Sequence, residues 1–414
     1  MQYSERYLHL GERIDLDTHV VCKYRVKTST MSMEEAAAAI ATEQSTGTWT
    51  DLVTLEEDVF EKYGAKVLEI DGDMATIAFP EDDFSIDVGG VPQILSIIAG
   101  NLFGLGDLEG VRLEDVVFPR SIIDQFPGPK IGVDGLRKTL ERPEKPLVGT
   151  IVKPKIGLSP KATADYIMEC GRGGLSNSKD DETLVDQSFC PIEDRTVAIA
   201  EALDTLKDEG HHMVHAINIS TSGHRIVELA ERVQELGASQ IMVDVLTAGF
   251  AAVQALAEDP SIKLPVHVHR TMHGAMTRNP DHGIAMLPIA KLCRMCGGDA
   301  LHIGTLGVGK MRGVCKEDLE NRDACLDGSV PYKPVMPVCS GGLHPGMVKK
   351  LVDIAGFDSQ IQAGGGVAGH PGGVRKGAMA MAQAVDAAYL GVGLEEHARD
   401  HPELAAALEK WGSL

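Results

Sequence analysis

From about residue 148 onward, short apolar runs alternate with segments whose apolar residues recur at helical spacing. One of these segments opens with Ser159 and Pro160, a pair typical of a helix N-cap and first turn. Eight strand-plus-helix units in a row match the roughly 250 residues of a (β/α)8 barrel. A doubly wound sheet is the alternative, but polar residues at nearly every strand end favour a closed barrel. The predicted strands are residues 148–152, 174–178, 213–219, 240–246, 264–269, 300–305, 335–340 and 361–364.

Residues 19–118 predict a second, smaller domain. A hairpin is indicated where residues 66–70 turn through Asp71-Gly72-Asp73 into residues 74–79. The order βαββαβ is typical of a ferredoxin-like α+β domain. The remaining predicted elements are strands at residues 19–26, 49–54 and 111–118 and helices at residues 33–41 and 91–103.

The two patterns give the α/β chain two domains. We expect a ferredoxin-like domain over residues 1–125 and a barrel domain over residues 126–414 that carries the catalytic residues. Residues 119–147 are rich in proline, glycine and charge, which is typical of a connection between domains.

The composition narrows the possible partners. Acidic residues number 60 against 39 basic ones, giving a net charge of −21 over 414 residues, and 43% of the residues are hydrophobic. This hydrophobic content excludes disorder as the main state, and the negative charge disfavours nucleic acid and membrane surfaces as partners. The acidity fits either an ordinary acidic enzyme or an adaptation to high salt.

The location follows from the cysteines and from the absence of a recognisable leader. Eight scattered cysteines and no secretory segment predict a reducing cytoplasm, and no apolar run reaches the roughly 18 residues of a membrane span. Cys293 and Cys296 form a lone CxxC, a spacing that without a second pair is more typical of core thiols than of a zinc site.

Polar residues gather where the predicted barrel strands end. In barrels of this type the active site lies at the C-terminal ends of the strands, so these residues should meet. Each residue alone has an ordinary explanation, such as a solvated lysine or a core histidine, but their presence on successive strand ends favours a site. They are Lys153-Pro154-Lys155, Lys179-Asp180-Asp181-Glu182, His267-Val268-His269-Arg270 with His273, His302, Ser340-Gly341-Gly342 and Gln362-Ala363-Gly364-Gly365-Gly366.

This set of residues suits a metal flanked by two anions. Asp181 and Glu182 offer hard oxygen ligands for Mg²⁺, and a carbamate formed from CO₂ on Lys179 would supply a third anionic ligand. The glycine runs after the seventh and eighth strands suit a phosphate held by backbone N–H groups, while Arg270 and His302 suit a second phosphate. The combination predicts a small sugar bisphosphate as substrate.

Three other motifs lead to different functions. Residues 304–310 match GxxxxGK, but Met311 stands where a P-loop needs Ser or Thr, and a GxGxxG at residues 364–369 has no following βαβ unit. A metallohydrolase is the stronger rival, because His267 and His269 with a carbamylated lysine can hold zinc. Against it, the two histidines lie on the fifth strand, and the phosphate sites would have no role.

At these residues the sequence resembles the large subunit of ribulose-1,5-bisphosphate carboxylase/oxygenase (RuBisCO). The resemblance covers essentially the whole chain, and the short chain with "GVGKM" and "ALEKWG" is most similar to the archaeal form III, which works without a small subunit. The segments that carry it are "ATEQSTGTWTDL", "AGNLFG", "RLEDVVFP", "TIVKPKIGLS", "GGLSNSKDDET", "HVHRTMHG", "HIGTLGVGKMRG", "CSGGLHPG" and "QAGGGVAGHPGG".

The resemblance implies a role for each barrel residue. Lys179 would be the carbamylated lysine, completing with Asp181 and Glu182 the ligands of Mg²⁺. Lys153 would transfer protons, His269 would act as a base in hydration, and Lys310 would stabilise the incoming carboxylate. The residues expected to contact the substrate or its phosphates are Lys155, Arg270, His273, His302, Ser340, Gly341, Gly342, Gln362, Ala363, Gly364 and Gly365.

The resemblance also implies a homodimer with shared active sites, since Glu43, Thr48, Trp49 and Asn101 match residues that complete the site of a partner subunit. The implied reaction is carboxylation, and also oxygenation, of ribulose 1,5-bisphosphate, with CO₂ or O₂ as the second substrate, and form III favours AMP-linked pentose salvage.

A RuBisCO-like enolase or isomerase is the alternative. Such proteins usually lose several of the residues named above, and this chain retains all of them. Three positions depart from common family patterns, namely Ile151, Thr183 and Arg312.

Overall fold

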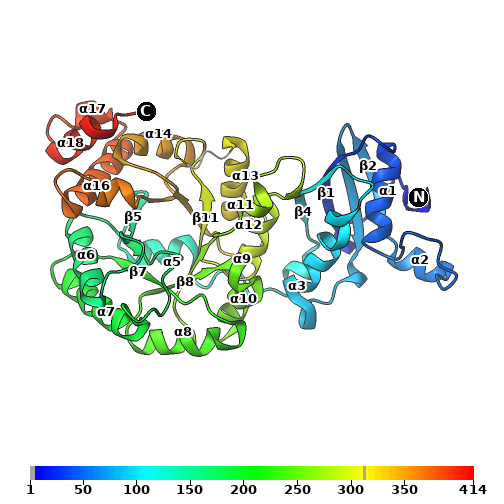
Figure 1. The fold of residues 1–414 in the computed structure, drawn as a ribbon, viewed down its shortest axis with the longest axis horizontal. Coiled ribbons are helices and arrows are strands. Elements are labelled where there is room, and N and C mark those ends of the chain that lie inside the picture. The colour runs from blue at the N-terminus through cyan, green and yellow to red at the C-terminus, as the bar shows by residue number, and fades with distance from the viewer. Residues whose placement is uncertain (1–4, 143, 311–313) are drawn as a thin grey trace. The chain divides into compact units, whose positions relative to one another are not determined.

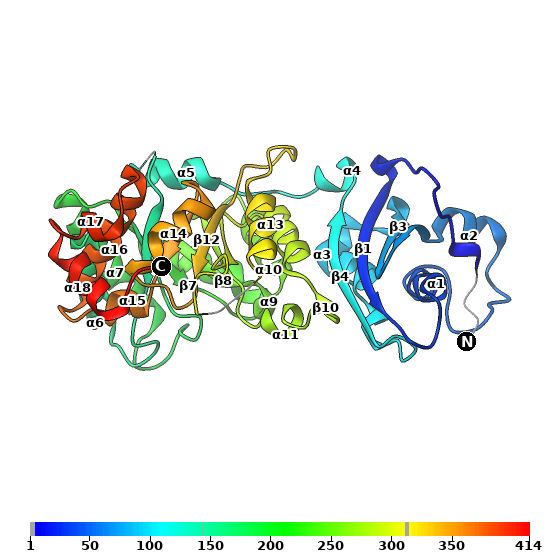
Figure 2. The same ribbon diagram turned by 90° about the horizontal axis from the view of Figure 1, so that it is seen from above.

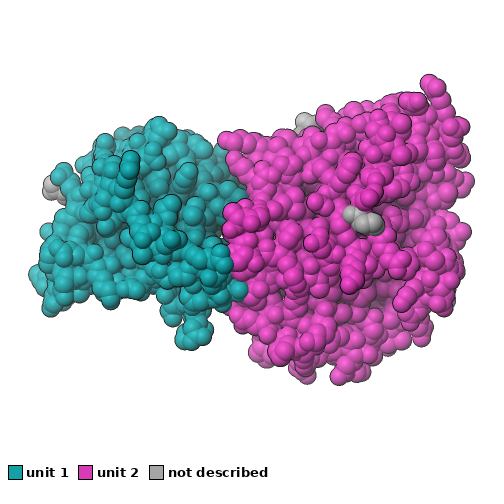
Figure 3. Space-filling model, turned by 180° about the vertical axis from the view of Figure 1, so that it is seen from behind, with its two compact units in different colours: residues 1–126, 272–292 teal, residues 127–271, 293–414 magenta. Residues whose placement is uncertain are grey.

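The computed structural model describes residues 5–142, 144–310 and 314–414 of the chain. The chain forms two compact units, shown in different colours in Figure 3. The first unit comprises residues 1–126 and 272–292, and the second comprises residues 127–271 and 293–414.

The second unit is built on a closed barrel of eight parallel strands (Figure 1). Neighbouring strands pair in chain order, with β10 excluded, and the last strand, β13, pairs with the first, β5, to close the ring. All eight strands predicted from the sequence are confirmed, with ends that differ by a few residues. The strands are β5 (Leu147–Ile151), β6 (Asn177–Lys179), β7 (Val214–Asn218), β8 (Gln240–Asp244), β9 (Val266–His269), β11 (Ala300–Gly304), β12 (Met336–Ser340) and β13 (Gln360–Gln362).

Helices surround this barrel (Figure 1), and most of them bury apolar side chains. The predicted N-cap is confirmed in α6, where the Ser159 side chain accepts a hydrogen bond from the Ala162 backbone N–H. The helices of this unit are α5 (Gly132–Thr139), α6 (Pro160–Arg172), α7 (Ile192–Asp208), α8 (Ile226–Glu235), α9 (Val245–Ala248), α10 (Phe250–Glu258), α13 (Cys315–Leu326), α14 (Pro345–Ala355), α15 (Gly365–Ala368), α16 (Val374–Leu390), α17 (Leu394–His397) and α18 (Pro402–Trp411).

Helix α5 covers the N-terminal end of the barrel. Its buried Val133 and Leu136 join a cluster with Leu147, Ala300 and Met336, which are the first residues of β5, β11 and β12. Burying one such side chain stabilises the fold by roughly 1.5–3 kcal/mol. Residues 119–147, which we expect to connect the two domains, thus also supply a helix that covers this end of the barrel. The opposite end of the barrel is left for the polar residues.

The first unit is a five-stranded sheet in the order β10-β4-β1-β3-β2. Antiparallel pairing of β4, β1, β3 and β2 confirms the predicted ferredoxin-like βαββαβ topology, and the short β10 adds to β4 in parallel. The elements are β1 (His19–Lys27), α1 (Met33–Glu43), α2 (Glu57–Tyr63), β2 (Lys66–Asp71), β3 (Met74–Pro80), α3 (Ile86–Ile98), β4 (Gly110–Val117), α4 (Arg120–Ile123), α11 (Gly274–Thr277) and β10 (Gly283–Ile284), and α12 (Met286–Met295) begins here and ends in the second unit.

The prediction of a strand at residues 49–54 is wrong. These residues form turns and bends, and the second strand of the motif is β2, which pairs with β3 through the predicted hairpin. The side chains do not alternate between buried and exposed positions, because the exposed fraction of Trp49 is 71% and Val53 is fully exposed. Apolar, β-branched residues thus occur here for a reason other than pairing in a sheet.

Helices α1 and α3 contribute much of the core of the first unit (Figure 2). In α1, Ser32 and Glu35 form a capping box, and Ala36 to Ala41 are all buried. The segment Ile86–Gly104 is long and apolar enough to cross a membrane by length and composition alone. It is bent at Gly90, where φ is 53°, and its Ile98 carbonyl accepts a hydrogen bond from the buried Tyr24 hydroxyl.

Asp83 is expected to make the stability of the first unit depend on pH. Its Oδ2 atom is buried and has no hydrogen-bond partner among the described residues, and burial raises its pKa to about 7. The folded state therefore holds a proton that the unfolded state releases near its ordinary pKa of 3.8, so stability falls as the pH rises from about 4 to about 7.

Replacing Asp83 by Asn removes this penalty. The melting temperature of Asp83→Asn should exceed that of the wild type by a margin that grows between pH 4 and pH 7 and then levels off. The exposed Asp58 provides the matched control, Asp58→Asn, in scanning calorimetry. A margin that does not change with pH would contradict the assignment.

Candidate active site

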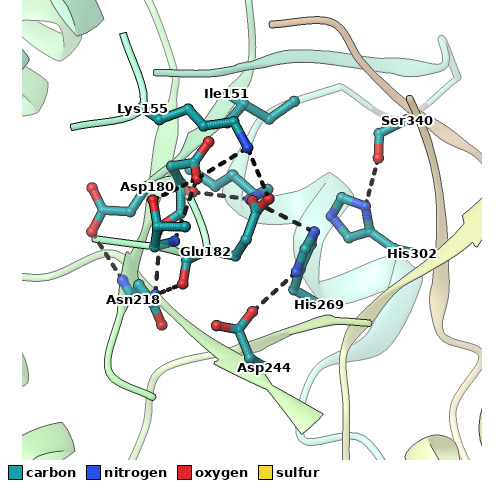
Figure 4. A network of polar contacts seen from close by, with 12 residues as sticks. Ile151, Lys155, Asp180, Glu182, Asn218, Asp244, His269, His302 and Ser340 are labelled. Carbon is teal, nitrogen blue, oxygen red and sulfur yellow. Dashed lines mark hydrogen bonds and ion pairs between the residues drawn. The ribbon is translucent and has the colours of Figure 1, made fainter. Parts of the chain in front are cut away.

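Polar residues from successive strands meet at the C-terminal end of the barrel (Figure 4). Lys179 is the last residue of β6, and Asp181 and Glu182 follow it directly. Lys153 follows β5, and His269 ends β9. The structure therefore brings together these five residues, as the sequence predicted.

Two lysines neutralise the paired carboxylates. The Lys153 ammonium donates a hydrogen bond to Asp181 Oδ2 at 2.8 Å. The Lys155 Nζ atom lies 3.6 Å from Glu182 Oε1 and 3.9 Å from Asp181 Oδ1. Both carboxylates thus stand between cations, with Asp181 almost fully buried and Glu182 half-buried. Burial tends to raise the pKa of Glu182, but the charges of Lys179 and His269 lower it to about 2. The lowered pKa favours the ionised form of Glu182, which a metal ion requires.

Lys179 is fully buried, and its charge is poorly solvated. Its Nζ atom donates to the Asp180 carbonyl at 2.9 Å and lies 3.6 Å from Glu182 Oε2. Burial lowers the pKa of Lys179, although the nearby carboxylates of Glu182 and Asp181 act in the opposite direction. A lowered pKa raises the fraction of neutral amine, which is the form that can react with CO₂.

A buried ion network fixes the loop that carries the carboxylates. Asp180 Oδ2 lies 3.2 Å from the Arg195 guanidinium and accepts the Asn218 backbone N–H at 3.0 Å, and Asp180 Oδ1 lies 3.1 Å from His215 Nε2. All four residues are inaccessible to solvent. Because Asp180 is held on both oxygens, Asp181 and Glu182 leave the strand end in a fixed direction.

Asn218 and Asp244 belong to the site although the sequence analysis did not select them. The Asn218 side-chain amide donates to the Glu182 carbonyl at 3.3 Å. Asp244 Oδ1 lies 3.0 Å from His269 Nδ1, and this contact orients the imidazole so that Nε2 faces Glu182 Oε2 at 3.9 Å. Asn218 ends β7 and Asp244 ends β8, inside the predicted strands 213–219 and 240–246. A polar residue near the end of a predicted strand was therefore the available signal.

A chain of hydrogen bonds links three side chains across β9, β11 and β12. His302 Nδ1 lies 2.7 Å from Ser340 Oγ, and His302 Nε2 lies 2.8 Å from His267 Nε2. Burial lowers the pKa of both histidines well below its usual value, so both are neutral, and one hydrogen is shared between the two Nε2 atoms. His302 and Ser340, both predicted to bind a phosphate, are therefore in contact with each other. The Nε2 atom of His267 is occupied by its hydrogen bond to His302.

The Arg270 guanidinium is held against β11, where Nη1 donates to the Ile303 carbonyl at 3.0 Å. Burial lowers the pKa of Arg270, and the charge of Asp318 partly opposes this effect. An arginine has an ordinary pKa far above neutrality, so the side chain stays cationic. It can therefore offer a positive charge at the end of β9.

The glycine segments after β12 and β13 approach Lys310 and Lys153. The Lys310 backbone N–H donates to the Gly341 carbonyl at 3.0 Å, and a side chain at Gly342, where φ is 72°, would collide with Lys310 Cβ. A Cβ atom at Gly364 would lie 2.8 Å from Lys153 Cε. A side chain at Gly342 would collide with Cβ and the backbone of Lys310, whereas one at Gly364 would displace the end of the Lys153 side chain.

Gln362 and the residues after it complete this side. Gln362 is 1% exposed, and neither of its amide atoms has a hydrogen-bond partner among the described residues. Ala363 is fixed through its backbone to Gly149 and Thr150, and open space surrounds Gly365 at the start of α15.

Five predicted residues lie in the first unit. Glu43 Oε1 accepts a hydrogen bond from the Asn101 side-chain amide at 3.4 Å. Thr48 and Trp49 line a pocket of about 260 Å³ together with residues of the same unit. His273 Nδ1 lies 2.9 Å from Thr277 Oγ1 at the start of α11. Arg312 and Met311, which the sequence analysis singled out, lie outside the described residues.

The donor set fits a hard divalent cation that needs one further ligand. Among the residues that the structure describes, no three His, Cys, Asp or Glu side chains gather as a metal site. Asp181 and Glu182 could supply two oxygen ligands, and a carbamate on the neighbouring Lys179 could add a third. The rival zinc site through His267 and His269 is disfavoured, because His267 Nε2 already pairs with His302.

Comparisons with known proteins agree with this geometry. A model of the catalytic domain of the ribulose bisphosphate carboxylase large chain matches residues 132–411, and a model of its N-terminal domain matches residues 9–122. Similar curated proteins include ribulose bisphosphate carboxylase of Methanocaldococcus jannaschii, 42% identical over 92% of this chain and 94% of that one. The protein of the same name from Methanosarcina mazei is 40% identical over 95% and 96%.

Solved structures show the same likeness in three dimensions. An octameric Rubisco from Pyrococcus horikoshii superposes with a TM-score of 0.92 at 39% identity, covering 99% of this chain and 96% of that one. A dimeric archaeal Rubisco from Hyperthermus butylicus superposes with a TM-score of 0.89 at 37% identity, covering 99% of both chains.

The buried ion network generates a stability prediction. Asp180→Asn should reduce the free energy of unfolding by about 3 kcal/mol or more, because Arg195 would keep its charge in a buried position without a counter-ion. Chemical denaturation followed by circular dichroism measures the change. Asp165→Asn is the control, since Asp165 pairs with Lys161 at the surface and should matter little. An equal effect of the two substitutions would show that the network does not stabilise the barrel.

Proposed function

The chain belongs to the family of ribulose bisphosphate carboxylase large chains, and on that basis we propose that it carboxylates ribulose 1,5-bisphosphate to two molecules of 3-phosphoglycerate. The observation that carries the proposal is the placement of Lys179, Asp181 and Glu182 at the end of β6 beside Lys153. That arrangement places a buried amine beside two carboxylates, whose oxygens suit a hard metal ion.

Activation would begin at Lys179. Its neutral amine attacks CO₂, a nitrogen–carbon bond forms and one proton is released, leaving an anionic carbamate. The reaction replaces a buried amine, whose charged form is poorly solvated, by an anion. This anion stands beside Asp181 and Glu182, where it can share a bound cation with them. Asp181, Glu182 and the carbamate would then hold Mg²⁺, which when bound supplies the positive charge that stabilises a developing enediolate.

The chain's own residues would carry the proton transfers. The carbamate of Lys179 removes the C3 proton of the substrate, and CO₂ adds at C2. His269, oriented by Asp244, acts as the base for the water that adds at C3. Cleavage of the C2–C3 bond leaves a carbanion on C2 that Lys153 protonates. Lys310 places a positive charge beside the newly formed carboxylate.

Two sets of residues would bind the phosphates. On one side, Arg270, His302 and Ser340 offer a guanidinium, a neutral imidazole and a hydroxyl. On the other side, the backbone of Gly341 and Gly342 and of residues 362–365 supplies amide N–H groups. Lys155 and His273 are proposed as further substrate contacts.

The assembly would be a homodimer or a larger set of dimers. Glu43, Thr48, Trp49 and Asn101 are proposed to complete the site of the partner subunit, which also explains why Trp49 and Val53 are exposed in a single chain. Similar archaeal structures are described as octameric and as dimeric. We also propose the domain division at residues 125/126, a cytoplasmic location, the oxygenase reaction and a role in pentose salvage.

An enolase or isomerase acting on a related phosphorylated sugar is the alternative function. It would use the same metal ligands but would not need Lys310 beside a new carboxylate. Incubation with labelled bicarbonate and ribulose 1,5-bisphosphate separates the two, since only carboxylation places the label in phosphoglycerate.

The first prediction in this assay concerns Lys179. The wild-type protein should fix label only after preincubation with CO₂ and Mg²⁺, because the unmodified lysine has the wrong charge for a metal ligand. Lys179→Arg cannot form a carbamate and should lose turnover at least about a hundredfold while staying folded. Activity of this variant at the wild-type level, or stoichiometric zinc in the purified protein, would favour a hydrolase.

The second prediction concerns the shared site. Glu43→Gln and Lys179→Arg subunits should each be inactive alone, but a mixed dimer contains one intact site and should recover activity. The experiment uses two affinity tags to isolate mixed dimers after subunit exchange. Isolated mixed dimers that stay inactive would show that Glu43 does not serve the partner subunit.

A further inference from the structure

Asp318 lies behind the segment that leads from β11 to Lys310. It stands in the first turns of α13, and it is 5% exposed. Its Oδ2 atom accepts hydrogen bonds from the backbone N–H groups of Thr305 at 3.0 Å and Leu306 at 2.8 Å. One carboxylate oxygen therefore fixes two consecutive residues directly after the strand.

The backbone of this segment is adapted to the carboxylate. Gly304 has φ of 137°, and a Cβ atom there would collide with the Asp318 carboxylate. Leu306 adopts φ of 52°, a conformation that an ordinary residue holds only when its surroundings enforce it. Both features indicate that the close approach of Asp318 determines how the chain leaves β11.

The same segment is held again at Lys310. The Val308 backbone N–H donates to the Thr305 carbonyl at 2.9 Å, closing a turn, and the Lys310 N–H donates to the Gly341 carbonyl at 3.0 Å. The position of Lys310 is therefore set by Asp318 at the start of the segment and by the glycine run after β12 at its end.

Asp318 also acts on the strand side of the site. Its negative charge faces the buried Arg270, whose guanidinium donates to the Ile303 carbonyl on β11. Asn321, one turn further along α13, donates to the same carbonyl at 3.3 Å. Two successive turns of α13 thus support the backbone before Lys310 and the end of β11.

We propose that Asp318 is a positioning residue that holds the Thr305–Leu306 backbone so that Lys310 faces the carboxylate formed during CO₂ addition. This inference rests on the proposed carboxylase function. Asp318 itself does not contact the substrate, and its effect is transmitted through the two backbone hydrogen bonds. Lys310 serves CO₂ addition and not proton removal at C3. Loss of Asp318 should therefore slow CO₂ addition and leave proton removal at C3 nearly unchanged.

The test compares Asp318→Ala with Asp318→Asn. The Asn oxygen can still accept the two N–H groups, whereas Ala leaves them without an acceptor. Asp318→Ala should lower kcat for carboxylation at least about tenfold, on the scale of a misplaced catalytic group, while exchange of the C3 proton with D₂O changes less than about threefold. Asp318→Asn should stay within about threefold of the wild type in both measurements.

The control is Asp323→Ala, which removes a carboxylate from the exposed side of the same helix. Lys310→Ala provides the reference for a selective loss of CO₂ addition. Equal loss of carboxylation and C3 exchange in Asp318→Ala, or an Asn variant as impaired as the Ala variant, would overturn the proposal. Should Asp318→Ala fail to fold, Asp318→Ser takes its place, since a serine hydroxyl is too short to reach both N–H groups.

A measurement without turnover keeps this inference separate from the proposed function. Hydrogen exchange of the peptide spanning residues 304–310, followed by mass spectrometry, should be faster in Asp318→Ala than in the wild type and Asp318→Asn. Unchanged exchange would overturn the positioning role even in an active enzyme. If the wild-type protein forms no phosphoglycerate while Asp318→Ala still shows the faster hydrogen exchange, only the proposed function is overturned.

Discussion

Burial of the Lys179 amine at the end of β6 is the constraint on which the rest of the site depends. A charged ammonium in a position without solvent is unfavourable unless anions surround it, and Asp181, Glu182 and Asp244 are all close enough to act on it. Those carboxylates in turn need cations when no metal is bound, and Lys153 and Lys155 fill that role. The site is thus a compact set of opposite charges packed against one another.

This set of charges requires a rigid support, because a shift of a few tenths of an ångström changes every interaction in it. Asp180, Arg195 and His215 supply the support below the carboxylates, with both oxygens of Asp180 engaged. On the opposite side, His267, His302 and Ser340 form a neutral chain, which keeps additional charge away from the lysines. The covered N-terminal end of the barrel, closed by α5, excludes water from below.

The segments that lead to Lys310 and past Lys153 are held by contacts of their backbone. Gly304, Gly342 and Gly364 each lie where a side chain would collide with a functional residue, so the close approach of the chain is built into the sequence. Asp318 and Gly341 hold the two ends of the segment that carries Lys310. Asp318 and Gly341, which are not proposed to react with the substrate, therefore determine the position of Lys310.

Local patterns in the sequence determined the eight barrel strands, the ferredoxin-like order and the residues at the strand ends, because apolar period and turn chemistry are properties of short segments. They failed at residues 49–54, where apolar and β-branched residues resemble a strand but have no neighbour to pair with. They also could not find β10, whose two residues pair with β4 from 170 positions later in the chain.

The side-chain partners of the site were decided by tertiary structure alone. Asn218, Asp244 and Asp318 look like ordinary polar residues in their own segments, and only folding brings them to Glu182, His269 and Thr305. The sequence therefore determined which chemical groups stand at the open end of the barrel. Their orientation and protonation came from long-range contacts, because burial and electrostatic interactions depend on distances between residues that are far apart along the chain.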